Sequence, residues 1–444
     1  MKWVDVYEPR RWIGKPSRRA VTRGRSIAFA ILPLRRASHN MPLAHTCDLF
    51  VIAGETSGDA YAAEVVRRLR ARYSDLTCAA MGGQALHDAG AEIEQGIDGL
   101  AVMGLGPVLA RLPSFIQLGL RMAQLIRSRR PKVVLTVDYP GFNLRLVRRL
   151  ADMRRDGTRF VHLVAPQVWA WKPRRAKSIA QSVDRLLCFF PFEPPLFSRF
   201  GVQADFVGHP LLDLIPPQVD TTAVSDELKL APDDRLLLLA PGSRPREVRA
   251  LLGLFHHAAE ALVPRLERDG RRVRVAVAKV PELPIALYRE ATDYPLVEGR
   301  YRELCARAQV GLIASGTATL EAGLIGLPHV IAYRTDRLTA MLARHLIRTP
   351  HIGLPNLVVG RRVCPEVLQD DLSVPRLVAH VERLWSGERR ADCLAGLAQT
   401  RKALGAGGAI DRIADLIDEE MSHGRRRADT LGRIDVLRND TTKG

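Results

Sequence analysis

Two short turns in the second half of the chain combine residue types that bind an anionic ligand. Pro-Gly-Ser-Arg at 241–244 follows the apolar run 236–240, and Ser-Gly-Thr at 315–317 follows the run 310–314. Each turn opens a helical pattern whose N-terminal N–H groups and dipole favour phosphate, and the arginine adds a planar cation suited to a diphosphate. Helix capping is the alternative for either turn alone, but the pair favours a nucleoside diphosphate. The residues assigned to this ligand are Gly242, Ser243, Arg244, Ser315, Gly316 and Thr317.

Polar residues also follow two apolar runs in the first half of the chain. The turn Gly-Glu-Thr-Ser-Gly-Asp at 54–59 comes after one run, and Asp-Tyr-Pro-Gly-Phe-Asn at 138–143 comes after another. Ligands of open parallel sheets bind at the carboxyl ends of the strands. All four turns fall at such ends, so we expect them to line the binding site.

The order of apolar runs and helical patterns predicts the fold class. The runs are Leu49–Ala53, Val133–Val137, Phe160–Val164, Arg185–Phe190, Leu236–Ala240, Val273–Lys279, Val310–Ala314 and His329–Ala332. Their alternation with helices predicts an α/β fold of two Rossmann-like domains whose parallel sheets face a central cleft. We divide the chain into a disordered basic extension (1–45), a first domain (46–220), a second domain (221–420) and a basic tail (421–444).

Length, charge and cysteine content restrict the class of protein. The 444 residues suffice for two α/β domains, and no apolar run reaches the roughly 20 residues that a membrane span requires. The formal charge of +18 is concentrated at the ends, with ten Lys or Arg against two acids in residues 1–45. Such arms fit an anionic membrane surface, and no aromatic-interleaved basic motif supports nucleic acid. Six scattered cysteines predict a reduced cytoplasmic setting without a metal or redox site.

Further motifs stand in a fixed order with these turns. They are Pro-Gln-Val-Trp-Ala-Trp (166–171), Phe-Val-Gly-His-Pro (206–210), Ser-Gly-Thr-Ala-Thr-Leu-Glu (315–321) and Leu-Pro-Asn-Leu (354–357). Together with the turns at 54–59, 138–143 and 241–244, the ordered set closely resembles the lipid-A-disaccharide synthase family. The resemblance runs from about residue 47 to about residue 415. It implies a glycosyltransferase of the two-Rossmann, GT-B type.

The resemblance also implies a reaction and a place for it. The family transfers diacylglucosamine from UDP-2,3-diacylglucosamine to 2,3-diacylglucosamine 1-phosphate. The products are UDP and a β-1,6-linked disaccharide, formed with inversion. The family works without a cofactor or bound metal at the cytoplasmic face of the Gram-negative inner membrane. The sequence agrees on the metal, because it has no Asp-x-Asp element that would hold a diphosphate through a divalent ion.

Two residues are our candidates for catalysis. An inverting transfer needs a base on the acceptor hydroxyl, and Asp138 matches the family's essential acidic position. Its alternative role is to cap the helix 144–154. Gly141 stands where many members have a second Asp, which leaves Asp138 as the candidate. Arg244 and the two helix N-termini must then neutralise the departing UDP.

The remaining site residues are assigned by the resemblance and their chemistry. Glu321 is expected to take the ribose hydroxyls, although it could simply complement a helix dipole. Asn356 and Gln369 are expected near the nucleotide, where amides can read uracil, with solvation as the alternative. The residues assigned to the acceptor sugar are Glu55, Ser57, Asp59, Asn143 and His209. Their alternatives are turn geometry, with Asp59 capping the helix that follows, and for His209 a hydrogen bond to the hinge backbone.

An apolar stretch from residue 102 to 122 offers a landing site for acyl chains. Arginines punctuate and follow it, as in segments that lie in a membrane interface. A pair of core helices is the alternative. The residues assigned to membrane or acyl contact are Met103, Leu105, Val108, Leu109, Phe115 and Leu118.

Two other classes of function stay open at this point. One is another UDP-sugar enzyme, either a different lipid-sugar transferase or an epimerase. The other is a non-catalytic basic protein that binds a membrane or RNA through its terminal arms. A homodimer is also left open, and removal of residues 1–40 is expected to leave activity intact.

Overall fold

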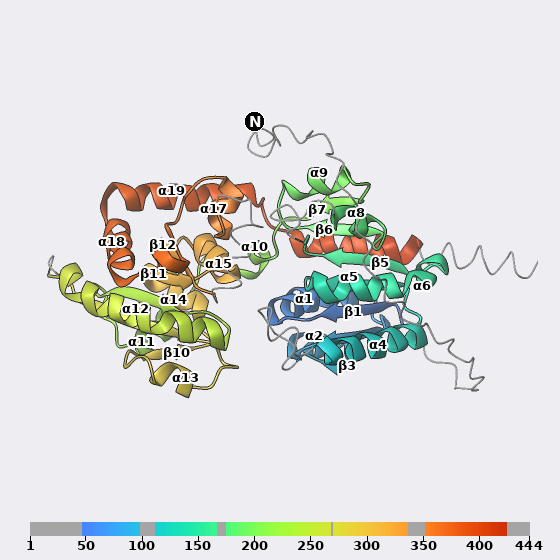
Figure 1. Ribbon diagram of the computed structural model, residues 1–444, viewed down its shortest axis with the longest axis horizontal. Coiled ribbons are helices and arrows are strands. Elements are labelled where there is room, and N and C mark those ends of the chain that lie inside the picture. Colours follow the sequence, from blue (N-terminus) through green and yellow to red (C-terminus); the bar gives the residue numbers. More distant parts are fainter. Residues whose placement is uncertain (1–46, 98–111, 167–174, 268–269, 336–350, 424–444) are drawn as a thin grey trace, which may run out of the picture.

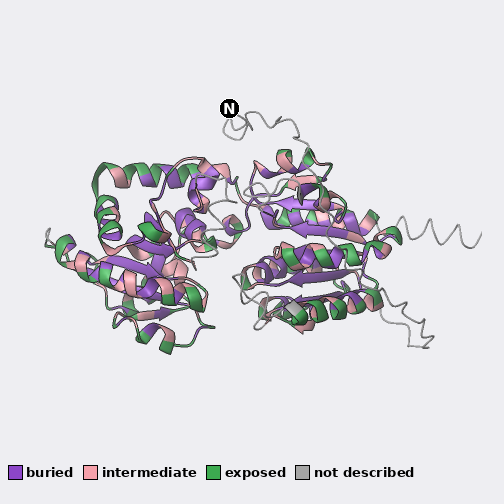
Figure 2. Cartoon of the chain, viewed as in Figure 1, coloured by how far each residue is buried: buried purple, intermediate pink, exposed green. Residues whose placement is uncertain are grey.

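The computed structural model describes residues 47–97, 112–166, 175–267, 270–335 and 351–423. These residues form two α/β units, each built on one parallel sheet (Figure 1). Buried strands lie between helices whose outer sides are exposed (Figure 2). The predicted fold class, with two parallel sheets, is confirmed.

The first sheet has seven strands within the described residues, in the order β3-β2-β1-β4-β5-β6-β7. Their bounds are β1 (Leu49–Ala53), β2 (Cys78–Gly82), β3 (Glu92–Gly96), β4 (Val133–Val137), β5 (Arg159–Leu163), β6 (Arg185–Cys188) and β7 (Ala204–Phe206). The central strands β1 and β4 are buried along their whole length, as expected for strands covered by helices on both faces. They pair residue for residue, ending with Ala53 opposite Val137. The polar turns that follow them therefore begin side by side.

The helices of the first unit cover both faces of this sheet. Their bounds are α1 (Thr56–Arg72), α2 (Gln84–Asp88), α4 (Leu112–Arg129), α5 (Pro140–Arg149), α6 (Ala151–Arg155), α8 (Arg175–Ala180), α9 (Glu193–Ser198) and α10 (Leu211–Leu214). The sequence predicted one helix over 144–154. The structure instead starts α5 at Pro140, a favoured first helical residue, and separates it from α6 at Leu150.

The second sheet has six strands within the described residues, in the order β10-β9-β8-β11-β12-β13. Their bounds are β8 (Arg235–Ala240), β9 (Val273–Lys279), β10 (Leu296–Glu298), β11 (Ala308–Ala314), β12 (His329–Tyr333) and β13 (Glu366–Leu368). The surrounding helices are α11 (Thr222–Glu227), α12 (Pro245–Leu266), α13 (Ala286–Arg289), α14 (Tyr301–Arg307), α15 (Thr317–Ile325), α17 (Leu354–Val359), the 3-10 turn η2 (Gln369–Asp371), α18 (Val374–Trp385) and α19 (Gly387–Ala403). Every apolar run predicted as a strand overlaps one of the observed strands.

A last helix, residues 409–423, returns to the first unit (Figure 1, red). Its residues Ile410, Ile413 and Ile417 are buried in the same cluster as the β1 residues Leu49 and Val51. The predicted division had placed residues up to 420 in the second domain and the tail from 421. The apolar stripe of this helix overrides that division, because the first sheet supplies the surface that buries it.

Ion pairs fix the position of this helix. Arg159 of β5 donates to Glu420 at 2.5 Å, and Arg185 of β6 donates to Glu419 at 2.6 Å. On the other side, the Tyr73 hydroxyl donates to Asp418 at 2.9 Å. These contacts join the helix 409–423 to β5, to β6 and to Tyr73, which follows α1. The division near residue 220 stays a prediction.

Candidate active site

The carboxyl ends of β1, β4, β8 and β11 carry the four polar turns that the sequence singled out. Two of these turns touch each other across the two units. Arg244, the N-cap residue of α12, forms an ion pair with Glu55, the N-cap residue of α1, with 3.3 Å between Nη2 and Oε2. This contact brings the turn at 241–244 in the second unit to the turn at 54–59 in the first unit.

Asp138, the residue after β4, is held in a strained backbone conformation. Its φ is 48° and that of Tyr139 is 47°. Left-handed residues other than glycine cost on the order of 1–3 kcal/mol each and concentrate at functional sites. Hydrogen bonds on both sides hold this conformation. The Asp138 N–H donates to the Leu163 carbonyl at 2.9 Å, and Asn143 Nδ2 donates to the Asp138 carbonyl at 2.7 Å.

The surroundings of Asp138 suit a general base. Burial raises the pKa of Asp138 to about 6, and the Glu55 carboxylate acts in the same direction. The Tyr139 N–H and the Arg244 guanidinium oppose this rise. A carboxyl group with this pKa is ionised at neutral pH yet basic enough to take a proton. The Asp138 carboxylate and the Arg244 guanidinium also lie close enough to interact electrostatically, although they follow strands of different sheets.

The turn at 241–244 is shaped around Glu247. Gly242 has a φ of 124°, and a Cβ atom there would lie 2.5 Å from the Glu247 side chain, so this position requires glycine. Glu247 Oε2 accepts from the Ser243 N–H at 3.0 Å, and Oε1 accepts from Arg244 Nη1 at 3.1 Å. An internal carboxylate thus contacts two of the donors that the sequence assigned to a diphosphate. In this structure those two donors are bonded to Glu247.

Glu321 of α15 is joined to an arginine that sequence reasoning missed. Arg302 of α14 donates through Nε to Glu321 Oε1 at 2.5 Å and through Nη1 to the Leu214 carbonyl at 2.6 Å. Leu214 is the last residue of α10, the helix that precedes the start of the second unit along the chain. The motif 315–321 pointed to Glu321, whereas no local pattern marks Arg302, because its partners lie 19 and 88 residues away.

Tyr61 of α1 connects this pair to the first unit. Burial raises the pKa of Tyr61 well above its usual value, Glu321 and Asp138 act in the same direction, and Arg302 opposes them. The ring lies among buried residues that include Leu320 of α15. The predicted nucleotide carboxylate and the predicted base therefore both lie close enough to one side chain of α1 to affect its titration.

Two predicted acceptor residues serve the backbone instead. Asp59 is buried, and its carboxylate accepts from the Gly83 and Ala85 N–H groups at 2.7 and 3.0 Å. It caps the neighbouring helix α2. The alternative role, a cap on its own helix α1, is not observed. His209 is also buried, and its Nδ1 accepts from the Leu211 N–H at 3.2 Å. Burial lowers its pKa to about 3, so the ring is neutral, and its Nδ1 holds the backbone at the start of α10.

Asn143 likewise serves the backbone of Asp138. The side chain is fully buried, and its Nδ2 donates to the carbonyls of Val137 and Asp138. Its role in this structure is to hold the strained turn rather than to face an acceptor. Of the predicted acceptor set, Glu55 and Ser57 are the half-buried residues at the start of α1.

The two amide side chains predicted to bind uracil, those of Asn356 and Gln369, differ in burial and in how many of their hydrogen-bonding atoms are already bonded. Asn356 is fully buried and uses its whole amide. Oδ1 accepts from Val363 and Cys364 N–H, and Nδ2 donates to the Cys364 carbonyl and to Glu366. This saturation corrects the predicted base-reading role. Gln369 is half-buried after β13, with a φ of 51°, and its Oε1 accepts from the Thr335 N–H at 3.3 Å.

Helix α4 revises the predicted membrane surface. Met103, Leu105, Val108 and Leu109 lie outside the described residues. Phe115 and Leu118 are half-buried, because the 3.6-residue period turns them toward the sheet. The exposed apolar side chains are Ile116 and Leu120, with 53% and 45% of their surface accessible.

A sequence model of the family described as lipid-A-disaccharide synthetase matches residues 49–404. This span covers both sheets and every turn of the site. The chain belongs to that family. It is a glycosyltransferase of lipid A biosynthesis.

Curated relatives of the lipid-A-disaccharide synthetase family agree over most of the chain. The lipid-A-disaccharide synthase of Myxococcus xanthus is 38% identical over 381 residues, which cover 85% of this chain and 98% of the relative. The enzyme of the same name from Geobacter sulfurreducens is 34% identical over 374 residues, or 84% of this chain and 96% of the relative.

Comparison with solved structures shows that this chain has a GT-B-like fold. A putative UDP-N-acetylglucosamine 2-epimerase from Listeria monocytogenes superposes with a TM-score of 0.57 at 13% identity, covering 85% of this chain and 97% of that chain. CalG4, the calicheamicin glycosyltransferase, gives a TM-score of 0.55 at 16% identity, covering 85% and 98%. At such low identity the likeness concerns the fold alone.

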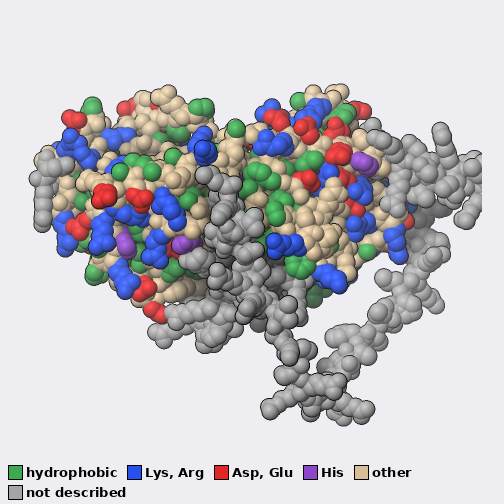
Figure 3. All heavy atoms as spheres, turned by 90° about the horizontal axis from the view of Figure 1, so that it is seen from above, with side chains coloured by type: hydrophobic (Ala, Val, Ile, Leu, Met, Phe, Trp, Pro, Cys, Tyr) green, Lys and Arg blue, Asp and Glu red, His purple; other side chains and the backbone are tan. Residues whose placement is uncertain are grey.

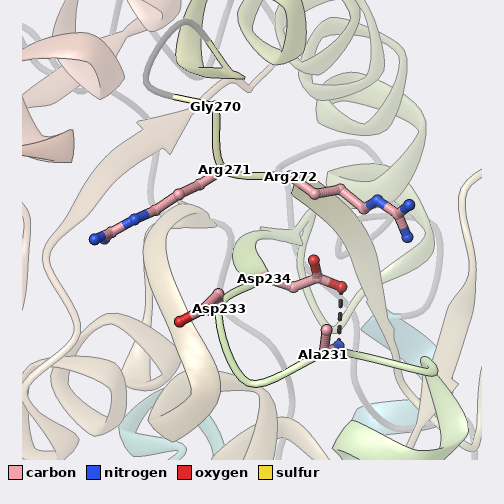
Figure 4. Close-up of a pocket in the computed structure, with 6 residues that line it drawn as sticks. All are labelled: Ala231, Asp233, Asp234, Gly270, Arg271 and Arg272. Atoms are coloured by element: carbon pink, nitrogen blue, oxygen red, sulfur yellow. Dashed lines mark hydrogen bonds between the residues drawn. The ribbon is translucent and has the colours of Figure 1, made fainter.

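A pocket of about 460 Å³ lies elsewhere in this family member (Figure 4). Its lining residues are Ala231, Asp233, Asp234, Gly270, Arg271 and Arg272. They precede β8 and β9, so the pocket lies at the amino ends of these strands. The four polar turns lie at the carboxyl ends of their strands, so this pocket lies at the opposite edge of the second sheet from the turns at 241–244 and 315–317.

Proposed function

We propose that the protein transfers diacylglucosamine from UDP-2,3-diacylglucosamine to 2,3-diacylglucosamine 1-phosphate. The products are a β-1,6-linked disaccharide 1-phosphate and UDP, formed with inversion. The observation that carries this proposal is the contact between Arg244 and Glu55, with Asp138 in the same electrostatic field. Arg244 is a cation suited to a leaving diphosphate, and Asp138 is a carboxylate suited to an acceptor hydroxyl. The contact with Glu55 holds Arg244 near Asp138.

The transfer is a single displacement. The acceptor oxygen forms a bond to the anomeric carbon of the donor sugar while the bond to UDP breaks. Asp138 takes the proton of the acceptor hydroxyl, and the bonding electrons leave with the UDP phosphate. Arg244 and the N-termini of α12 and α15 stabilise the charge that develops there. Every group in this step belongs to the chain or to its two substrates.

The nucleotide is recognised by the second unit. Glu321 offers its Oε2 to the ribose hydroxyls, since Oε1 is bonded to Arg302. Gln369 is the remaining amide candidate for uracil, because Asn356 is saturated. The exposed residues Gly316 and Thr317 present the start of α15 to the phosphates.

Lipid substrates reach the site beside α4. The rings of Phe115 and Tyr139 lie 6.3 Å apart, so the start of α4 is next to the turn that carries Asp138. The exposed side chains of Ile116 and Leu120 continue that surface outward, and the exposed Arg121 and Arg127 can meet anionic headgroups. We place this surface on the cytoplasmic face of the inner membrane. The helices in the described ranges include none that is long and apolar enough to cross a bilayer.

The deciding experiment supplies both lipid substrates to the purified protein in the presence of a chelator. Mass spectrometry should detect the disaccharide 1-phosphate together with stoichiometric UDP. Arg244→Met should weaken UDP binding and turnover together, by roughly 10- to 100-fold, the worth of a lost charge-assisted hydrogen bond. Conversion of the donor to an epimer without release of UDP would refute the transferase reaction.

A further inference from the structure

A cluster of metal-ligating side chains lies on α12, away from the transferase turns. His256, His257 and Glu260 bring their ligand atoms within 4.8 Å of one another. His256 lies eleven residues beyond Pro245, the first residue of the helix, which corresponds to about 17 Å along its axis. The transfer reaction uses none of these three residues.

The distances within the cluster match those between ligands of one small cation. His256 Nε2 lies 3.5 Å from Glu260 Oε1, and His257 Nδ1 lies 3.0 Å from Glu260 Oε2. Nitrogen and oxygen ligands bound at 2.0–2.1 Å in a tetrahedral zinc site lie about 3.3 Å apart. The two observed distances lie on either side of that value.

A supporting group holds one imidazole in place. His256 Nδ1 lies 3.2 Å from Thr292 Oγ1, whose oxygen also accepts from the Tyr294 N–H at 3.1 Å. A proton on Nδ1, donated to this oxygen, leaves Nε2 free to ligate. Metal-ligating histidines nearly always have such a partner on the other ring nitrogen. The buried Thr292 fixes the ring from outside α12.

The charge of the cluster favours a divalent cation. Asp293 Oδ1 lies 3.8 Å from His256 Nδ1, on the ring edge that also faces Thr292. The Glu260 carboxylate lies within the cluster and the Asp293 carboxylate lies next to it, so negative charge surrounds the place where a cation would bind. Imidazole and carboxylate ligands suit zinc, nickel or cobalt, and all-oxygen sites suit magnesium or calcium.

We propose that His256, His257 and Glu260 bind one divalent transition-metal ion, with Thr292 as a supporting group. The ion lies beside the middle of α12, which runs from Pro245 to Leu266. It takes no part in glycosyl transfer, so a chelator should remove it without abolishing the reaction.

Calorimetry on the untagged, full-length protein tests this site with zinc chloride. The wild type should bind one zinc ion with a dissociation constant in the micromolar range. His257→Gln and Glu260→Gln should each weaken binding at least tenfold, and Thr292→Val should weaken it by about tenfold, as the loss of a supporting group does. His87→Gln, at an exposed histidine beside Asp88 on α2, is the matched control and should leave binding unchanged.

Two further measurements separate the site from other ligands. Zinc should raise the melting temperature of the wild type but not of Glu260→Gln, whose metal-free melting temperature should equal that of the wild type. Cobalt should give a visible spectrum of nitrogen and oxygen ligation. A thiolate charge-transfer band, or zinc affinity that survives both Glu260→Gln and His257→Gln, would overturn the proposal.

Discussion

At the scale of the single residue, one carboxylate combines backbone strain, burial and a nearby cation. Asp138 is held in the left-handed region by Asn143 and by its own N–H, while Glu55 and burial raise its pKa to about 6. Because Arg244 opposes this rise, the pKa depends on a residue of the other unit. If Arg244 binds a diphosphate as proposed, we expect part of that opposition to be removed and the pKa of Asp138 to rise further.

The first prediction concerns Asp138→Asn and pH. At pH 7.5 this variant should lower kcat by about 10²- to 10⁴-fold, the usual worth of a general base, and still bind UDP. In the wild type, kcat/KM should fall about tenfold per pH unit below pH 6, because a protonated carboxyl group cannot accept a proton. A pH–rate profile from pH 5 to 8 checks both statements. Unchanged turnover would remove Asp138 from the mechanism.

The same substitution should change stability in a pH-dependent way. The pKa of Asp138 is raised from 3.8 to about 6 by folding, so the folded protein binds more protons than the unfolded chain between pH 4 and 6. The destabilisation from this group is therefore fully present above pH 6 and absent below pH 4. Asp138→Asn should melt about 3 °C higher than the wild type at pH 8 and at the same temperature near pH 4. Equal melting temperatures at pH 8 would contradict the raised pKa.

At the scale of the elements, side chains that join helices and strands decide which polar residues remain for ligands. Arg302 connects α14 to α15 and α10, and Asn356 connects α17 to the segment before β13. Arg302 bonds only Oε1 of Glu321, so Oε2 remains for a ligand. Asn356 uses both the donor and the acceptor of its amide within the protein. Two predictions follow from this contrast.

Arg302→Lys should raise the KM for the donor by about tenfold and leave the KM for the acceptor within twofold. Lysine keeps the charge but lacks the planar fork that holds Glu321 and the Leu214 carbonyl together. Steady-state kinetics with each substrate varied in turn checks the split. The control is Arg265→Lys, at an exposed ion pair with Glu382, which should change neither constant. Equal increases in both constants would show a general loss of structure instead of donor positioning.

Asn356→Ala should destabilise the protein by about 3 kcal/mol, because it leaves the buried N–H groups of Val363 and Cys364 without their acceptor. Denaturant unfolding measures this loss. Below the unfolding transition, the KM for the donor should match the wild type. A raised KM with unchanged stability would restore the base-reading role that the sequence suggested.

At the scale of the whole molecule, the helix 409–423 completes the first unit from the far end of the chain. Its isoleucines lie in the core around β1, and its acidic residues pair with Arg159, Arg185 and Arg72. Basic side chains are spread over the visible surface of both units, mixed with acidic ones (Figure 3). The packing of the first sheet therefore depends on residues that follow the whole second unit.

Removal of residues 409–444 should lower the melting temperature by about 10 °C or more, since the apolar cover of the first sheet is lost. The matching removal of residues 1–40, which precede the family match, should leave activity and melting temperature unchanged. Thermal unfolding and the disaccharide assay compare the two truncations. Full stability without the last helix would contradict its place in the core.

Local patterns in the sequence determined eight of the thirteen strands in the described residues, the polar turns at the ends of four of them and the glycine turn at Gly242. Periodicity, glycine and capping residues act over a few positions, so these features can be read without the rest of the chain. The order of the motifs along the chain indicated the family to which the chain belongs. The same patterns marked the turns that hold Asp138, Arg244 and Glu321, and the roles of these residues stay predictions.

Only the tertiary structure decided which of those polar residues are free to act. Asp59, His209 and Asn356 are bonded to backbone groups, whereas Arg302 and the helix 409–423 gained roles that no motif marks. The physical reason is that a buried polar group must find a hydrogen-bonding partner, and an apolar helix face must find a surface to cover. The partners of Arg302 and of the helix 409–423 lie 88 and 261 residues away, where no local spacing records them.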